Sequence, residues 1–434
     1  MSPLGRCDVL ASDDHVVVVG AGHAGVQLVD SLRSGGFHGG ITLLSREAER
    51  PYQRPPLSKD FIAGAGTPAP LPLRGDAFFD DARVRALWGV SAESVDTAAR
   101  KLLTSTGERV PYTALVLATG SDNRRLHVPG SELDGVVSLR TLADARAARA
   151  ALDGARHAVV VGAGFVGLEF AAAARSRGVD VTVIGPTDRP LRRSVSPAVS
   201  AYLAARHALD GVRLELGSGV AAFRGGAEGT ARQGRVEAVV TAEGRELPAD
   251  LVVVGIGALP ATQLASQSGL AVGDGVRVDG ELRTSDPHVF AIGDCASFPS
   301  QHAGRRVRLE SVQNATDQAR HVAGVLCGDD PGAYSELPWF WSHQGPTKLQ
   351  IAGLGRSGTT CVVRGDRGSG KFSVFAFDTS SDGAELVAVE SVNSPGDHMA
   401  ARRILSGGRP LSPQDAADLS FDLKAYSRTV PALA

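Results

Sequence analysis

The amino-acid sequence predicts an α/β protein that contains two Rossmann-like dinucleotide-binding folds. The same theme occurs twice along the chain: a run of valines, three spaced glycines, apolar residues at helical spacing, and then a second apolar strand. A length of 434 residues leaves room for about three domains, so both folds fit within one chain.

The first copy of the theme lies near the N-terminus. Its parts, in order, are a strand at 15–19, the glycines Gly20, Gly22 and Gly25, a helix at 26–32 and a strand at 41–44. In such a motif the first glycine permits a tight turn, the second lets the backbone approach a pyrophosphate, and the third allows close packing of helix on strand. The phosphate then lies at the positive end of the helix dipole.

The second copy is built in the same way. Its parts are a strand at 158–161, the glycines Gly162, Gly164 and Gly167, a helix at 168–176 and a strand at 179–184. Two complete units of strand, glycine motif, helix and strand predict two dinucleotide sites. The alternative for the second copy is a fold that is retained without its nucleotide.

Two further buried strands end in turns of the kind found beside nucleotides. Residues 114–117 are followed by Ala118, Thr119 and Gly120, and residues 289–292 are followed by Gly293 and Asp294. The Asp294 carboxylate is suited to accept hydrogen bonds from sugar hydroxyls. The alternative is that Asp294 is the N-cap of a following helix.

The composition excludes several classes of function. With 45 basic and 47 acidic residues, the net charge of −2 gives no general attraction for nucleic acid or an anionic membrane. No apolar run approaches the ~20 residues that span a bilayer, and residues 1–14 lack the pattern of a secretory signal, so we expect a soluble, cytoplasmic protein. The cysteines have neither Cys-x-x-Cys nor metal-cluster spacing, so we expect no redox dithiol, iron–sulfur centre or metal site on Cys7, Cys295, Cys327 and Cys361.

Six short segments identify a family. They are RPYQRPPLSK at 50–59, the turn at 118–120, AIGDCA at 291–296, RLESVQNA at 308–315, PWFWS at 338–342, and residues 393–405. In this order they resemble the FAD-dependent ferredoxin reductases that serve cytochromes P450 and ring-hydroxylating dioxygenases. This family includes relatives of putidaredoxin reductase and apoptosis-inducing factor, within the pyridine nucleotide-disulfide oxidoreductase superfamily.

The resemblance implies two Rossmann-like domains of the glutathione-reductase type and a smaller C-terminal α/β domain. The FAD-binding domain is split between residues 1–124 and 247–333, the NAD(P)-binding domain at 125–246 is inserted between, and the C-terminal reductase domain covers 334–434. The disulfide-reducing members of the superfamily carry a cysteine pair over the flavin, whereas this chain has proline, proline and leucine at 55–57. Dithiol chemistry is therefore not expected.

Four residues are implied at the reacting rings. Lys59 resembles the lysine beside the flavin and pairs with Glu169 on the helix after the second glycine motif, where a cation favours electron-rich flavin. The alternative is a surface ion pair worth at most about 1 kcal/mol. Glu310 corresponds to the acid near the nicotinamide carboxamide. Trp341 is similar to the tryptophan near the stacked rings, and its alternative is an ordinary core aromatic.

The resemblance also implies the remaining contacts to both cofactors, and Val312 opens a helix whose amides stabilise the reduced flavin anion. The expected FAD residues are Gly20, Gly22, His23, Ala24, Gly25, Arg46, Glu47, Arg54, Pro55, Lys59, Ala118, Thr119, Gly120, Arg124, Gly293, Asp294, Ser311, Val312 and Trp341. The expected NAD(P) residues are Gly162, Gly164, Phe165, Val166, Gly167, Glu169, Gly185, Arg189, Gly257 and Glu310.

Three positions depart from the family pattern. Arg46 stands where an acid binds the FAD ribose, so either the adjacent Glu47 substitutes or Arg46 contacts the adenosine. Gly185 stands where an acid binds the NAD ribose, which leaves the coenzyme open, with NADH slightly favoured over NADPH. Nearby cations able to meet a 2′-phosphate are Arg189, Arg192 and Arg193. His343 replaces an aspartate and is either structural or a modulator.

The resemblance implies an NAD(P)H-dependent ferredoxin reductase. Hydride passes from nicotinamide C4 to flavin N5, and single electrons pass to a 2Fe-2S ferredoxin that feeds a cytochrome P450 or a Rieske-type oxygenase. The protein is expected to be a monomer or a homodimer. Basic side chains that either steer an acidic ferredoxin or are merely solvated are Arg305, Arg306, Arg308, Arg402 and Arg403. The alternative functions are an FAD-dependent oxidoreductase acting directly on a small molecule and a redox-sensing flavoprotein.

Overall fold

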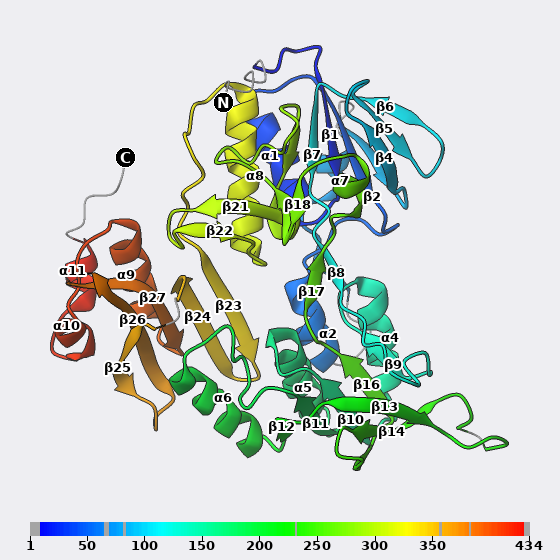
Figure 1. Ribbon diagram of the computed structural model, residues 1–434, viewed down its shortest axis with the longest axis vertical. Coiled ribbons are helices and arrows are strands. Elements are labelled where there is room, and N and C mark those ends of the chain that lie inside the picture. The colour runs from blue at the N-terminus through cyan, green and yellow to red at the C-terminus, as the bar shows by residue number, and fades with distance from the viewer. Residues whose placement is uncertain are drawn as a thin grey trace. The chain divides into compact units, whose positions relative to one another are not determined.

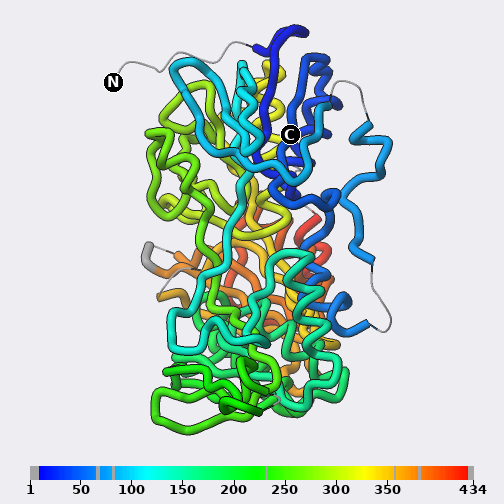
Figure 2. The backbone as a smooth tube through the Cα atoms, turned by 90° about the vertical axis from the view of Figure 1, so that its right-hand side faces the viewer, coloured from blue at the N-terminus to red at the C-terminus, as the bar shows by residue number. Residues whose placement is uncertain are grey.

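The computed structural model describes residues 9–64, 69–80, 84–230, 232–355, 358–381 and 383–428 (Figure 1). The chain forms two compact units, each assembled from segments far apart in the sequence. The first unit is Met1–Gln53, Leu71–Asp122 and Leu259–Trp339, and the second is Arg54–Pro70, Asn123–Ala258 and Phe340–Ala434. In Figure 2 the first unit accordingly combines blue, cyan and yellow-green segments. Cys7 and the first part of residues 1–14, for which no secretory signal is expected, lie outside the described residues.

A parallel sheet forms the centre of the first unit. Its strand order is β20-β7-β1-β2-β3, with bounds Val289–Ala291, Ala114–Leu117, His15–Val19, Gly40–Ser45 and Val84–Trp88. The valines of β1 are buried because such a sheet is covered on both faces. Helices α1 (His23–Ser34) and α8 (Val312–Cys327) lie side by side against this core.

Smaller elements complete the first unit. An antiparallel sheet consists of β4 (Ala92–Asp96), β5 (Lys101–Thr104) and β6 (Arg109–Pro111). A mixed sheet consists of β18 (Val272–Gly273), β19 (Gly275–Arg277), β21 (Ala296–Ser300) and β22 (Arg305–Val307). The short helices are α3 (Asp76–Phe79), α7 (Gln263–Gln267) and the 3-10 helix η2 (Gly293–Cys295). Strand β8 (Ser121–Asn123) pairs with β17 (Ala258–Pro260).

The second unit contains the other parallel sheet. Its order is β12-β11-β10-β16-β9, with bounds Arg213–Leu216, Asp180–Gly185, His157–Val161, Leu251–Val254 and Val136–Ser138. Its helices are α4 (Leu142–Leu152), α5 (Phe165–Ser176), α6 (Pro197–Leu209), η1 (Pro55–Ser58) and α2 (Asp60–Ala63). An antiparallel sheet is added by β13 (Val220–Gly225), β14 (Val236–Thr241) and β15 (Glu246–Pro248).

The C-terminal part of the second unit is a five-stranded sheet covered by three helices. The strand order is β23-β24-β27-β26-β25, with bounds Trp339–Gln344, Thr347–Gly353, Gly383–Val392, Lys371–Ser381 and Thr360–Asp366. The helices are α9 (Pro395–Ser406), α10 (Pro413–Ala417) and α11 (Leu423–Arg428). Phe375, Phe377 and Val389 pack against Ile404 to form its core.

The predicted fold class is confirmed, and both glycine motifs lie between a parallel strand and a helix. Helices α1 and α5 each begin three residues earlier than the apolar spacing predicted, because each starts directly after its second glycine. The bounds of the four domain segments stay a prediction. Among the described residues, no helix combines the length and the apolar composition of a membrane span. The cytoplasmic location also stays a prediction.

Acidification is expected to destabilise the C-terminal part through His398 on α9. Its side chain is 1% exposed, and burial, with the charges of Arg402 and Lys348, lowers its pKa from 6.5 to about 4. The unfolded chain therefore binds the His398 proton more tightly than the folded chain does. The free energy of unfolding is unaffected above pH 6.5 and falls by roughly 3 kcal/mol as the pH falls towards 4.

Thermal unfolding between pH 7 and pH 4 checks this expectation. We expect the unfolding temperature of His398→Leu to depend less on pH, whereas the same change at the exposed His38 leaves the pH dependence unaltered. An equal acid response in His398→Leu and the unmodified protein would contradict the assignment.

Candidate cofactor sites

The first glycine motif has the backbone that a bound pyrophosphate requires. Gly20 has φ +111°, and a Cβ there would lie 2.2 Å from the Ala118 carbonyl oxygen; a Cβ at Gly25 would lie 1.9 Å from the Gly20 carbonyl oxygen. A Cβ at Gly22 would meet nothing within 4 Å, so free space lies where a phosphate is expected. Helix α1 begins at His23 with no side-chain cap. Its first-turn amides are therefore not occupied by a capping side chain.

The second glycine motif repeats this geometry. Gly162 has φ +113° and lies against the Gly255 carbonyl oxygen, and Gly167 lies against the Gly162 carbonyl oxygen. The nearest atom to a Cβ at Gly164 would be 4.0 Å away, and helix α5 also begins without a side-chain cap. Both motifs thus present an open approach to helix amides, so the donor sets of both fit a dinucleotide.

The turns after β7 and β20 meet within the first unit. Gly120 has φ +69° and Gly293 has φ +73°, both in the left-handed region that favours glycine. Between these turns Ser121 Oγ donates to Asp294 Oδ2 at 3.1 Å. Asp294 lies inside η2, and the chain continues as strand β21. The N-cap alternative for Asp294 was therefore wrong, and its contact with a sugar stays a prediction.

The two residues after β2 already have protein partners. Arg46 pairs with Asp122, and the Tyr52 hydroxyl donates to Glu47. Arg46 is well exposed, with 60% of its side chain accessible. Both alternatives, Glu47 at the FAD ribose and Arg46 at the adenosine, stay predictions.

Lys59 and Glu169 form the expected pair, and it is buried. Lys59 Nζ lies 2.7 Å from Glu169 Oε2, with 16% and 4% of the side chains exposed, so the surface alternative was wrong. Ser58 donates to Oε2 and Ser342 to Oε1 of the same carboxylate, each at 2.6 Å. Lys59 also donates to the Pro55 carbonyl oxygen at 2.9 Å. Two charges that are largely removed from water need additional hydrogen bonds to offset the loss of solvation, and Ser58, Ser342 and the Pro55 carbonyl oxygen provide them.

Other expected residues of the second unit have contacts of their own. The rings of Phe165 and Phe340 pack in a tilted arrangement with centroids 4.6 Å apart, and the ring of the partly buried Trp341 lies 6.5 Å from that of Phe340, centroid to centroid. The Arg54 guanidinium donates to the Arg140 carbonyl oxygen at 2.9 Å. Val166 is 41% exposed at the start of α5. The backbone amide of Arg124 donates to the carbonyl oxygen of Gly257, whose φ is +108°.

The entrance to α8 in the first unit has the expected form. Val312 is its first residue, and Ser311 is its N-cap, accepting from the Asn314 amide at 3.0 Å. Glu310 accepts from Arg308 at 2.6 Å. Arg308 is only 11% exposed and also pairs with Asp274, so it is not one of the solvated arginines.

The described residues contain no thiol pair and no group of side chains able to hold a metal. Cys295, Cys327 and Cys361 are all free. Cys295 is fully buried, and burial raises the pKa of its thiol. Burial also raises the pKa of the Cys327 and Cys361 thiols, so the thiolate form is disfavoured at all three described cysteines.

Comparison with known proteins gives the family. The model of the pyridine nucleotide-disulphide oxidoreductases matches residues 14–319, and the model called Reductase C-terminal matches residues 339–427. A rhodocoxin reductase of Rhodococcus erythropolis is 46% identical over 409 residues, covering 94% of this chain and 93% of that protein. The chain belongs to the ferredoxin reductases of oxygenase systems, within the pyridine nucleotide-disulphide oxidoreductases.

Two further ferredoxin reductases match over nearly their whole length. The ferredoxin–NAD(+) reductase component of the anthranilate 1,2-dioxygenase system of Burkholderia cepacia is 40% identical, covering 96% of this chain and 100% of that protein. The reductase in the crystal structure of the covalent putidaredoxin reductase–putidaredoxin complex has a TM-score of 0.91 and 36% identity, covering 97% and 100%. The resemblance drawn from the six segments is confirmed, and membership of this oxidoreductase family implies FAD and NAD(P)H.

Several functional neighbours were missed from the sequence. Ser58 and Ser342 stand inside segments that carried the resemblance, yet nothing in those segments indicated that both donate to Glu169. No sequence pattern indicated that Asp122 pairs with Arg46 or that Tyr52 donates to Glu47.

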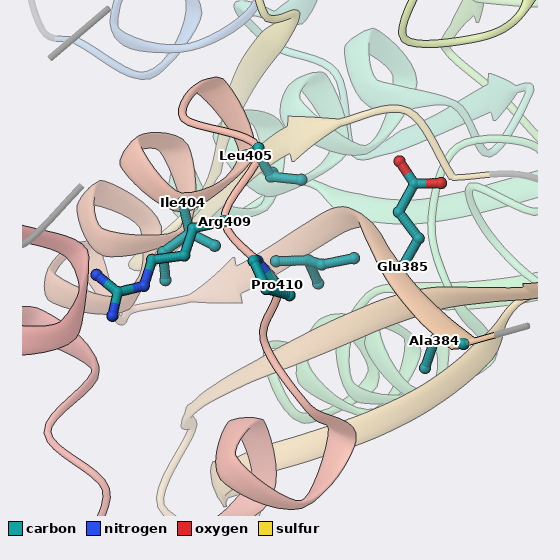
Figure 3. Close-up of a pocket in the computed structure, with 9 residues that line it drawn as sticks. Ala384, Glu385, Ile404, Leu405, Arg409 and Pro410 are labelled. Atoms are coloured by element: carbon teal, nitrogen blue, oxygen red, sulfur yellow. The ribbon is translucent and has the colours of Figure 1, made fainter. Parts of the chain in front are cut away.

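A separate hollow of about 290 Å³ lies in the C-terminal part and contains none of the expected site residues. Leu386, Ile404 and Leu405 line it. The Arg409 side chain points away from the hollow (Figure 3), and its guanidinium lies over the Tyr426 ring, 4.0 Å from the ring centroid. Glu385 points away from Pro410 at its other side. Among the described residues no set of polar groups converges on the hollow, so it gives no basis for a second ligand site.

Proposed function

We propose that this ferredoxin reductase takes hydride from NADH and delivers single electrons to a 2Fe-2S ferredoxin that feeds a cytochrome P450 or a Rieske-type oxygenase. The observation that carries this proposal is the buried Lys59–Glu169 pair, fixed by Ser58 and Ser342. A buried ammonium costs several kcal/mol to desolvate, and its charge is suited to stabilise electron-rich flavin. The relatives named for ferredoxin and putidaredoxin support the class of acceptor.

The cofactors are assigned by the two glycine motifs. We assign FAD to the first motif, with residues 1–124 and 247–333, NAD(P)H to the second, with residues 125–246, and residues 334–434 to the reductase domain. Bound FAD supplies the conversion of a two-electron hydride into two single electrons. The chain's residues bind and orient the cofactors and exclude water. The glycines leave room for the pyrophosphates, and α8, which begins at Val312, presents its N-terminal amides. Lys59 with Glu169 supplies a fixed charge pair.

NADH is the proposed coenzyme because two of the three nearby arginines are engaged within their own loop. Arg189 donates to the carbonyl oxygens of Val195 and Arg192, and Arg192 pairs with Asp188. Among the described residues, Arg193 is the one of these three arginines without a hydrogen bond or ion pair to the protein, which leaves one cation for a 2′-phosphate. The NAD(+) in the name of the Burkholderia relative supports the same choice.

Gly185→Glu is expected to raise the preference for NADH over NADPH by about tenfold in kcat/KM, because a carboxylate accepts from both ribose hydroxyls and repels a 2′-phosphate. The position tolerates a side chain, since a Cβ would lie 3.6 Å from the Ala163 nitrogen and has no closer neighbour. Steady-state kinetics with both coenzymes measure this ratio. Arg193→Ala is the matched control and should affect NADPH alone; an unchanged ratio in Gly185→Glu would contradict the placement of the ribose.

The proposed function is tested by oxidising NADH with the FAD-loaded protein in the presence of purified two-iron ferredoxins, under anaerobic conditions. We expect ferredoxin reduction in a 2:1 ratio to NADH consumed. NADH oxidation that depends on a small-molecule acceptor and ignores every ferredoxin would replace the proposal with a small-molecule oxidoreductase. A long-lived reduced complex without turnover would replace it with a redox sensor.

A further inference from the structure

Glu169 is the end of a longer set of buried polar side chains. Strand β23 alternates, so Ser342 and Gln344 both face inward while His343 between them is exposed. Ser342 is 0%, Gln344 2% and His207 3% exposed. Groups buried this far are retained only when their hydrogen bonds are satisfied.

These side chains are hydrogen-bonded in sequence. His207 Nε2 lies 2.8 Å from Gln344 Oε1, Gln344 Nε2 lies 3.5 Å from Ser342 Oγ, and Ser342 Oγ lies 2.6 Å from Glu169 Oε1. The far oxygen of that carboxylate, Oε2, accepts from Lys59 and Ser58. The set therefore joins α6, β23 and α5 to the segment that follows Arg54.

The donors in this set all point the same way. The Gln344 oxygen accepts, so His207 carries its proton on Nε2; the Gln344 amide donates to Ser342, and the Ser342 hydroxyl is left to donate to the carboxylate. Burial lowers the pKa of His207, which keeps its ring neutral and consistent with this single tautomer. A chain of bonds that ends on a negative charge is polarised towards it, which strengthens each link.

The C-terminal sheet also holds α6 at two other points. Glu390 of β27 accepts from the Ser196 amide at 2.8 Å at the start of the helix, and Phe372 of β26 meets the Tyr202 ring at its middle, with centroids 5.3 Å apart. His207 lies in the last turn of the helix. The helix that presents His207 is thus fixed along its length, so the chain of hydrogen bonds has a rigid far end.

We propose that His207, Gln344 and Ser342 are positioning residues that orient the Glu169 carboxylate, and through it the Lys59 ammonium, for hydride delivery from the nicotinamide coenzyme. The inference rests on the proposed function, because that function places the Lys59–Glu169 pair at the reacting rings. It gives the C-terminal part a role in the reductive half-reaction: β23 fixes one oxygen of Glu169 and leaves the other for Lys59. Loss of one link lets the carboxylate rotate and weakens the alignment of its cation.

The test uses FAD-loaded protein mixed with NADH in a stopped-flow instrument, with the limiting reduction rate and the coenzyme Kd recorded separately. We expect Ser342→Ala and Gln344→Leu each to lower the limiting rate about tenfold while Kd changes less than about threefold. Ser373→Ala is the matched control: it removes a hydroxyl that is also fully buried in the same sheet and bonded to Ser391, but it does not contact this set. It should reduce at the unmodified rate.

A double-variant comparison separates positioning from general damage. Adding Ser342→Ala to Glu169→Gln should slow reduction by less than about twofold further, because both changes act on one carboxylate. Full multiplication of the two losses, an unchanged rate in both single variants, or an equal loss in Ser373→Ala would overturn the inference while leaving the reductase function intact. No reduction of the unmodified protein by either coenzyme would instead overturn the proposed function, and the inference with it.

A readout independent of turnover is the nitrogen NMR signal of the His207 ring in protein labelled at histidine. We expect the Nε2–H tautomer, with a signal that Gln344→Leu displaces and Ser373→Ala leaves in place. A ring protonated on Nδ1, or a signal indifferent to Gln344→Leu, would overturn the inference.

Discussion

Gly22→Ala is expected to give a folded protein that is colourless because it has lost FAD, whereas Gly164→Ala is expected to remain yellow and to lose affinity for NADH. Both positions have extended backbone, φ −78° and φ −86°, and neither has an atom closer than 4.0 Å to the added Cβ. Alanine therefore fits the fold at both positions, and the methyl group enters only the space proposed for a pyrophosphate.

We expect the FAD Kd of Gly22→Ala and the NADH KM of Gly164→Ala each to rise about tenfold or more. Flavin absorbance after gel filtration and steady-state kinetics measure the two effects, and circular dichroism checks the fold. Gly25→Ala provides the contrast, since its Cβ would lie 1.9 Å from the Gly20 carbonyl oxygen and should prevent folding of the first unit. Loss of FAD from Gly164→Ala rather than from Gly22→Ala would reverse the assignment of the cofactors.

The second large effect is expected from Glu169→Ala. The change leaves the Lys59 ammonium, 16% exposed, without its counter-charge and leaves two buried serine hydroxyls without their acceptor. Breaking a buried pair on one side costs about 3–5 kcal/mol, so thermal unfolding should occur at a clearly lower temperature. Flavin reduction by NADH should also slow about 100-fold, because a preorganised charge at the reacting rings is lost.

Stability and rate are expected to separate in the double variant Lys59→Met with Glu169→Leu. Apolar side chains of similar volume remove both buried charges together, so the part of the thermal stability lost through the unpaired ammonium should return. The Ser58 and Ser342 hydroxyls still lack their acceptor, so the recovery should be partial. The reduction rate should stay low, because the cation does not return. A double variant that reduces at the normal rate would contradict a role for the pair in hydride transfer and would leave it a structural ion pair.

The sequence predicted those parts of the molecule that depend on local backbone chemistry. Gly20 and Gly162 have the positive φ that a tight turn between strand and helix requires, and the valine runs before them are buried parallel strands. Val312 begins its helix as expected. Asp294 was mistaken for a possible N-cap because a strand rather than a helix follows it, and a single aspartate carries no information on which element comes next.

The contacts between segments distant in the chain could not be predicted from sequence patterns alone. Lys59 and Glu169 are 110 positions apart, and only the resemblance to a family suggested that they pair. His207 and Gln344 are 137 positions apart, and nothing suggested that they meet. One signal was present: His207 follows Val199 and Leu203 at a spacing of four, which puts it on the buried face of α6. A histidine on an apolar face requires a partner, but its identity depends on packing.

Anaerobic stopped-flow absorbance can follow both half-reactions, the acceptance of hydride by the flavin and the release of single electrons, in one experiment. The yellow protein is mixed first with NADH or NADPH and then with an oxidised two-iron ferredoxin. We expect NADH to bleach the flavin, followed by rapid reduction of the ferredoxin with return of the yellow colour. Absence of bleaching with either coenzyme, or bleaching without transfer to any ferredoxin, would contradict the proposed function.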